Sequence, residues 1–296
     1  MRDEKLLLTD TLREKFKIKN KLLKKAIGEI FGTFLLCFIG LSVIAQLILK
    51  NEKMNTWIQI NVGWGFAVTF SALAVSKVSG GHLNPAVTML FFTFKIIDFK
   101  TMLVYFISQV IGAFLGAAGV YVLYYDLFEA FDGGVRTISG PKGSAAVFTT
   151  FSPDWLSPRG AFIDQIVGTG ILCLFVVAII DKKNKIPEYL HCLFFGLVLL
   201  MIGCAFGANL GYPINPARDF GPRLFAFIIY GPEVFTYPYP TYWLITIIAP
   251  LIGGVLFGWS YYFFSGFHID EEPVQIIKSE YEPVSTTDIP LKVVKH

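Results

Sequence analysis

Six long apolar runs constrain this chain more than any other feature of its sequence. Each is long enough to cross a bilayer as a helix, for which about 20 apolar residues are needed. Together they contain two acidic residues, Glu29 and Asp164, and no Lys or Arg. The runs cover approximately residues 26–49, 57–76, 101–125, 160–180, 189–212 and 242–267. The sequence therefore predicts an all-α membrane protein with six transmembrane helices.

Composition and charge distribution agree with this class of protein. Only 16% of the 296 residues are charged, whereas a soluble domain has about 25%. With the N-terminus inside, 18 Lys and Arg residues fall in inner segments and seven in outer ones. The positive-inside rule then predicts that both termini are cytoplasmic. The four cysteines lie within apolar runs without metal-ligand spacing, so neither a disulfide framework nor a metal site is predicted.

Two further apolar stretches, 84–94 and 215–230, are too short to cross a bilayer, and each begins with Asn-Pro-Ala. Asn is a good N-cap, and Pro is favoured at the first helical position, so each tripeptide predicts the start of a helix. Non-helical backbone at membrane depth is tolerated only where it is buried in protein or lines a wet cavity. The predicted pore boxes are Asn84, Pro85, Ala86, Asn215, Pro216 and Ala217.

An internal repeat relates the two boxes. GEIFGTFLL opens the first run at 28–36, and DQIVGTGIL opens the fourth at 164–172. Three spans separate equivalent points, so the second half enters the membrane from the opposite side. Inverted repeats of this kind place a site near the midplane, formed by broken helices from both halves. The two half-helices should meet at their N-termini and direct two positive dipole ends at the centre.

The backbone before each box is expected to line the solute path. Glycines suit a backbone that approaches a solute closely, and each Asn can cap its helix while directing an amide N–H at the solute. The candidate pore carbonyls are those of Gly80, Gly81, His82, Leu83, Gly211 and Pro213.

With paired Asn-Pro-Ala boxes and six spans, residues 24–267 resemble the aquaporin family. The resemblance implies six transmembrane helices plus two re-entrant half-helices in an inverted repeat, four protomers in a homotetramer, and one pore in each protomer. It assigns the selectivity filter, by spacing from the boxes, to Trp64, Gly203, Tyr212 and Arg218. Strictly water-selective members have a histidine where Gly203 stands, so this filter resembles that of the glycerol-conducting branch, the aquaglyceroporins. Removing the imidazole is expected to widen the pore.

Four more residues are expected to support the loops. Asp219 and Arg223, spaced i, i+4, can neutralise one another beside the filter. In the family, residues at the places of Glu29 and Gln165 brace the loops that carry the boxes; a proton relay at Glu29 is the alternative. His82 is expected to be a structural hydrogen-bonding residue, with gating as its alternative.

Three other features bear on the outer half of the pore. The long connection 126–159 resembles the larger outer vestibule of aquaglyceroporins. Pro213 departs from the small or apolar residue with an N–H that is expected there. Cys204, next to Gly203, is a candidate for mercury sensitivity.

The prediction is a passive channel for glycerol, other small uncharged solutes such as urea, and water, which excludes protons and ions. The alternative is a water-selective channel that conducts glycerol poorly. No constellation for an enzyme or a coupled transporter is present, and no cofactor, catalytic residue or nucleic-acid partner is predicted. We expect a basic cytoplasmic N-terminus (1–25), a channel domain (26–267) in the lipid bilayer of the plasma membrane, and a disordered cytoplasmic tail (268–296).

Overall fold

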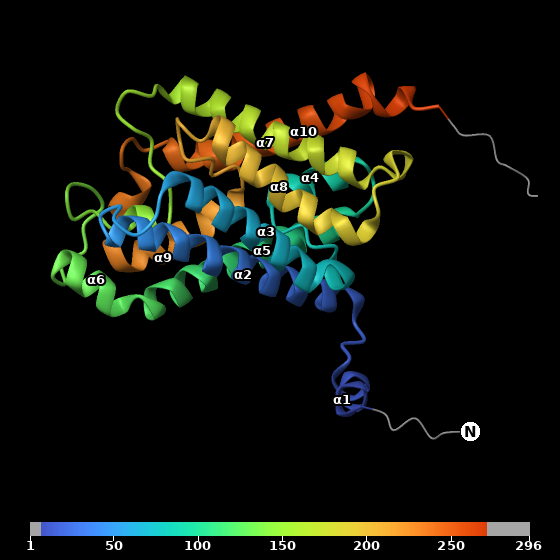
Figure 1. Cartoon of the computed structure of the whole chain (residues 1–296), viewed down its shortest axis with the longest axis horizontal. Coiled ribbons are helices and arrows are strands. Elements are labelled where there is room, and N and C mark those ends of the chain that lie inside the picture. Colours follow the sequence, from blue (N-terminus) through green and yellow to red (C-terminus); the bar gives the residue numbers. More distant parts are fainter. Residues whose placement is uncertain (1–6, 271–296) are drawn as a thin grey trace, which may run out of the picture.

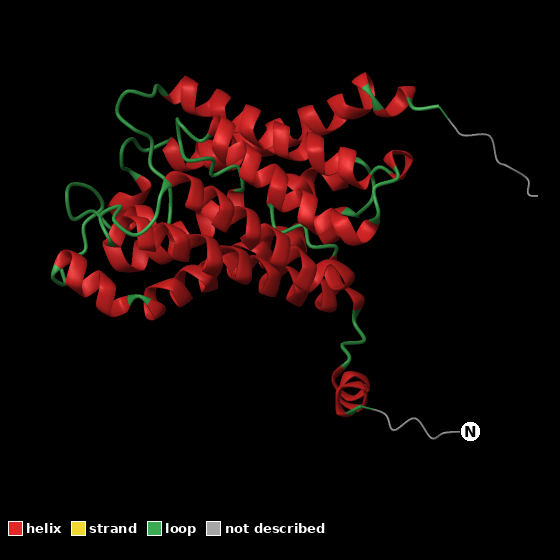
Figure 2. Cartoon of the chain, in the orientation of Figure 1, coloured by secondary structure: helices red, strands yellow, loops and turns green. Residues whose placement is uncertain are grey.

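The computed structural model describes residues 7–270, which are helical and contain no strand (Figures 1 and 2). Six of the described helices are long and apolar enough to cross a membrane, as predicted. They are α2 (Lys21–Leu49), α3 (Trp57–Ser79), α5 (Phe99–Leu123), α7 (Pro158–Ile180), α8 (Glu188–Phe206) and α10 (Tyr242–Phe264). Nearly all of the predicted tail, 271–296, lies outside the described residues.

The two short helices begin directly after the asparagines of the boxes. α4 (Pro85–Thr93) and α9 (Pro216–Tyr230) each have Pro at the first position. α4 packs on α10, and α9 packs on α5, so each short helix contacts the third long helix of the other half. The predicted all-α architecture, with six spans and two half-helices in an inverted repeat, is thereby confirmed.

Small residues let the spans of each half approach closely, and they do so in equivalent places. A Cβ on Gly112 of α5 would collide with the carbonyl oxygen of Ile30 in α2. A Cβ on Gly253 of α10 would collide with the carbonyl oxygen of Ile166 in α7. Ile30 and Ile166 occupy matching positions in the repeated sequence. Such packing of small residues is typical of helices in membranes.

Several helix ends differ from the sequence prediction. The fifth span ends at Phe206 rather than at 212, because the following chain turns at Gly207 and takes positive φ angles at Gly211 and Tyr212. α2 begins at Lys21, five residues before the predicted start, because the side chain of Asn20 accepts hydrogen bonds from the first turn.

Two helices were not anticipated. α1 (Leu8–Phe16) precedes the first span. α6 (Tyr125–Asp132) follows α5 after a break at Tyr124, where the predicted third span would have continued. Four short 3-10 turns complete the described helices: η1 (Ala145–Val147), η2 (Lys182–Asn184), η3 (Pro232–Phe235) and η4 (Gly266–His268).

Candidate pore

A cavity of about 950 Å³ lies between the two halves of the bundle. Residues such as Trp57 and Thr150 line one end, and Lys77 and Glu188 line the other. Most of the predicted path residues contribute to its wall: Trp64, Gly80, Gly81, His82, Leu83, Asn84, Gly211, Tyr212, Pro213, Asn215 and Arg218. Gly203 is not among the lining residues.

Each box asparagine donates a hydrogen bond to the backbone of the residue before the other box. Asn84 Nδ2 donates to the carbonyl oxygen of Ile214 at 3.1 Å, and Asn215 Nδ2 donates to that of Leu83 at 2.8 Å. Each Oδ1 meanwhile accepts from the backbone at the start of its own helix. An amide carries two N–H groups, so one N–H of each asparagine remains for a solute. Because each asparagine caps one short helix and also reaches the residue before the other box, the N-termini of α4 and α9 face each other.

The residue before each box adopts a left-handed backbone conformation. φ is +53° at Leu83 and +32° at Ile214, which is uncommon for side chains other than Gly. This conformation directs each carbonyl at the opposite asparagine. The Leu83 carbonyl, a candidate contact for the solute, accepts one hydrogen bond from Asn215 in this arrangement and has a second lone pair.

Glu29 holds the loop before the first box. Its carboxyl oxygens accept hydrogen bonds from Ser79 Oγ at 2.6 Å and Gln109 Nε2 at 2.7 Å. They also accept from the backbone N–H groups of His82 and Leu83 at 3.0 and 2.8 Å. Glu29 is fully buried. A carboxylate that accepts this many bonds fixes the path of the loop.

Gln165 has the equivalent place in the second half. Its Oε1 accepts a hydrogen bond from the backbone N–H of Ile214 at 3.0 Å, and its Nε2 donates to Asp164. Asp164 also accepts from Asn209 at 2.8 Å. Both repeats thus use the same span position to hold the box loop.

Arg218 lies beside Trp64 in the wall of the cavity. Its guanidinium carbon is 4.7 Å from the centre of the Trp64 ring, a distance typical of a cation–π contact. One amino group, Nη1, donates to the carbonyl oxygen of Phe148 at 3.2 Å. Only 7% of the residue is exposed, although it lines the cavity. The loop that contains Phe148 therefore positions the arginine.

Tyr212 and Asn61 form a hydrogen-bonded pair beside Gly203. The Tyr212 hydroxyl donates to Asn61 Oδ1 at 2.6 Å. A Cβ on Gly203 would lie 2.7 Å from Asn61 Cγ and 2.8 Å from Tyr212 Cε1, closer than real atoms pack. The glycine therefore makes room for this pair. Gly203 itself does not line the cavity, but Tyr212 does, so a side chain at position 203 would act on the width of the cavity through this pair.

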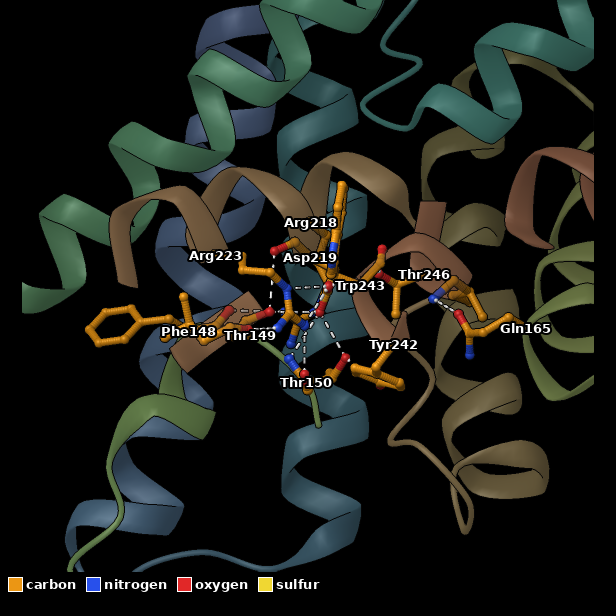
Figure 3. Close-up of polar contacts among 12 residues, drawn as sticks. Phe148, Thr149, Thr150, Gln165, Arg218, Asp219, Arg223, Tyr242, Trp243 and Thr246 are labelled. Atoms are coloured by element: carbon orange, nitrogen blue, oxygen red, sulfur yellow. Dashed lines mark hydrogen bonds and ion pairs between the residues drawn. The ribbon is translucent and has the colours of Figure 1, made fainter. Parts of the chain in front are cut away.

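Asp219 joins α9 to α10 and to the loop that contains Thr149 and Thr150 (Figure 3). Its Oδ1 accepts from the hydroxyls of Thr149 and Thr150 at 2.9 and 2.7 Å, and its Oδ2 accepts from the Thr246 hydroxyl at 2.8 Å. The same Oδ2 is 2.9 Å from Nη2 of Arg223. Because Asp219 follows Arg218 directly, this network fixes the start of α9.

Arg223 completes the network and is fully buried. Its Nη1 donates to the Val234 carbonyl oxygen at 2.6 Å, and its Nη2 donates to the Thr150 carbonyl oxygen at 2.7 Å. A buried ion pair persists only when its remaining polar groups are satisfied, and these carbonyls satisfy them. Neither Asp219 nor Arg223 lines the cavity.

Three contributors were missed by the sequence analysis. Asn61, Phe148 and Thr150 lie far from the boxes in the chain, and nothing in their local sequence distinguishes them. Cys192 lines the cavity, whereas Cys204 does not and instead lies beside Asn61, whose Nδ2 is 3.6 Å from its Sγ. Residues 7–270 contain no group of three His, Cys, Asp or Glu side chains that could hold a metal ion.

Comparisons with known proteins give relatives over nearly the whole chain. The major intrinsic protein family profile matches residues 17–261. Mouse aquaporin-9 is 39% identical over 282 residues, which cover 95% of each chain. Human aquaporin-10 is 33% identical and covers 93% of this chain and 92% of its own. The X-ray structure of the aquaglyceroporin from Plasmodium falciparum superposes with a TM-score of 0.73 at 33% identity, covering 81% of this chain and 95% of that one.

Proposed function

The chain belongs to the major intrinsic protein family, whose members are membrane channels and not enzymes, and we propose that it conducts glycerol, other small neutral solutes and water while it excludes protons and ions. Aquaglyceroporins among its relatives support passive conduction of glycerol and small solutes.

The constriction carries the proposal for glycerol. Trp64 and Tyr212 offer two aromatic surfaces to the cavity, and Arg218 offers hydrogen-bond donors. A polyol that loses its water must have its hydroxyls bonded again, or each costs about 2–7 kcal/mol. The Tyr212 hydroxyl donates a hydrogen bond to Asn61. This bond holds the Tyr212 ring as an apolar surface for the carbon side of the solute.

The paired half-helices support the exclusion of cations and protons. Their N-termini meet where Asn84 donates a hydrogen bond to the Ile214 carbonyl oxygen and Asn215 donates one to the Leu83 carbonyl oxygen, so two positive dipole ends lie close together. Arg218 adds a full positive charge on the path. An arginine and half-helix dipoles are established electrostatic barriers in aquaporin-type pores.

Assembly and location are part of the same proposal. The family resemblance favours a homotetramer with a pore in each protomer, in the plasma membrane. The start of α2 and the end of α10 lie at the same end of the bundle (Figure 1), as an even number of spans requires. The excess of Lys and Arg on that side favours the cytoplasm.

Uptake of radiolabelled glycerol into proteoliposomes tests whether transport is passive. We expect glycerol to reach equal concentrations on both sides, at a rate that pH or sodium gradients leave unchanged, while labelled sucrose stays outside. Entrapped pyranine should report no proton flux above that of empty vesicles. Accumulation of glycerol above the external concentration under a gradient would contradict the proposal.

A further inference from the structure

α1 presents an apolar stripe that the rest of the described chain does not cover. Leu8, Leu12 and Phe16 are spaced by four residues and therefore lie on one face of the helix. They are 73%, 40% and 70% exposed, and α1 buries none of its residues. Leu7, just before the helix, is 69% exposed as well. Side chains of this size rarely remain in water along one helix face unless they have a binding partner.

Basic residues surround this stripe. Residues 7–25 contain seven Lys or Arg and two acidic residues, a net charge of +5 (7 − 2). On the helix itself, Arg13 and Lys15 flank the apolar face from either side, and the Arg13 side chain bonds to Asp10. An apolar stripe flanked by positive charge complements an anionic lipid surface.

The position of α1 brings the stripe to the membrane. Residues 17–20 join it to the first span, and Asn20 caps that span with bonds to two backbone N–H groups, both at 3.0 Å. In Figure 1, α1 is viewed nearly end-on while the spans run across the view, and it lies to the side of the bundle near the end at which α2 begins. A helix across the direction of the spans, beside the bundle, has the orientation of one lying on a bilayer surface.

We propose that α1 is an interfacial anchor, which lays Leu8, Leu12 and Phe16 into the headgroup region of an anionic leaflet while the basic residues from Arg13 to Lys25 contact the lipid phosphates. The position beside the bundle excludes α1 from the pore mouth in this arrangement. The occupant of the apolar face is lipid, and neither a second copy of the chain nor another protein is required.

Hydrogen exchange of the full-length protein in liposomes tests the anchor. Vesicles of phosphatidylcholine with 30% phosphatidylserine are compared with pure phosphatidylcholine, at 0.05 and 0.5 M KCl. We expect the amides of residues 8–16 to exchange about tenfold more slowly in the anionic vesicles at low salt, because the helix opens only after it leaves the surface. Protection should decrease in neutral vesicles and at high salt.

Two sets of substitutions separate the apolar face from helix propensity. The triple variant Leu8→Gln/Leu12→Gln/Phe16→Gln replaces the apolar stripe by glutamine, whose helix propensity is similar to that of leucine. This variant should lose the protection. The matched control, Thr9→Gln/Thr11→Gln, should retain it. Glycerol flux should be unchanged in both, which shows that the channel is folded.

Either of two results would overturn the proposal. If the amides of residues 8–16 exchange at equal rates in the wild type and in the triple variant, both in anionic vesicles, no anchor forms. Protection that is the same in neutral vesicles and at high salt would show that a protein surface, such as a second copy, covers the stripe instead.

Discussion

Replacing Gly203 by alanine tests how the proposed constriction is built. The added methyl group would collide with Asn61 Oδ1 and would lie 2.8 Å from Cε1 of Tyr212. Overpacking of this kind costs about 1–3 kcal/mol, and loss of the Asn61–Tyr212 hydrogen bond adds about 1 kcal/mol. Tyr212 lines the cavity, so the collision can be relieved by moving its ring toward the solute path. The two costs total about 2–4 kcal/mol, and if the displaced ring transfers about 1.4 kcal/mol of this to the barrier for permeation, Gly203→Ala lowers glycerol permeability by about tenfold.

A second substitution distinguishes this mechanism from simple narrowing by the methyl group. Asn61→Ala removes the side chain with which the methyl group collides, so the double variant Gly203→Ala/Asn61→Ala should conduct glycerol better than Gly203→Ala alone. The double-mutant cycle should show a coupling of about 1 kcal/mol or more. Tyr212→Phe, which removes the hydroxyl and keeps the ring, should change flux less than Gly203→Ala.

The assay is glycerol permeability of proteoliposomes that contain equal amounts of each variant, measured by stopped-flow light scattering. Additive effects of Gly203→Ala and Asn61→Ala would refute the reasoning. So would wild-type flux through Gly203→Ala, because the methyl group would then have found space that the structure does not contain.

The remaining predictions concern charge and thiol chemistry. Arg218→Val should raise proton or cation flux, measured with entrapped pyranine, while the protein stays folded. An unchanged flux would show that Arg218 does not contribute to the exclusion of ions. Asp219→Asn leaves the buried Arg223 without its counter-charge and should lower the free energy of unfolding by about 3–5 kcal/mol, measured by thermal unfolding in detergent; an equally stable variant would disprove that the pair supports the fold. A small mercurial should slow glycerol flux by reacting with Cys192, which lines the cavity. Cys192→Ser should therefore abolish the inhibition, and Cys204→Ser should leave it unchanged. The reverse pattern would contradict the position of the two thiols.

The spans and the half-helices could be predicted because their signals are local. Apolar length identified six helices, and Asn84-Pro85 and Asn215-Pro216 identified two helix starts at which the observed caps form. The repeat followed from the match between the segments at 28–36 and 164–172. Each of these inferences needs only neighbouring residues and the known thickness of a bilayer.

The rest of the site depends on contacts between distant segments. Phe148 lies 70 residues from Arg218, and the hydrogen bond from Tyr212 to Asn61 joins residues 151 positions apart. A glycine next to empty space and a glycine that makes room for a neighbouring pair look the same in the sequence, so the function of Gly203 required the structure. α1 escaped prediction because nine residues are too few for its periodicity to stand out among charged neighbours.

The measurement that tests the central claim most directly is stopped-flow light scattering of proteoliposomes. Glycerol is added outside the vesicles, and the response is compared with that to the same concentration of a non-permeant sugar. The account predicts rapid shrinkage in both, followed by fast re-swelling in glycerol only, at a rate well above that of protein-free vesicles. Rapid shrinkage without re-swelling in glycerol would contradict it, and the chain would then be a water channel whose constriction rejects polyols.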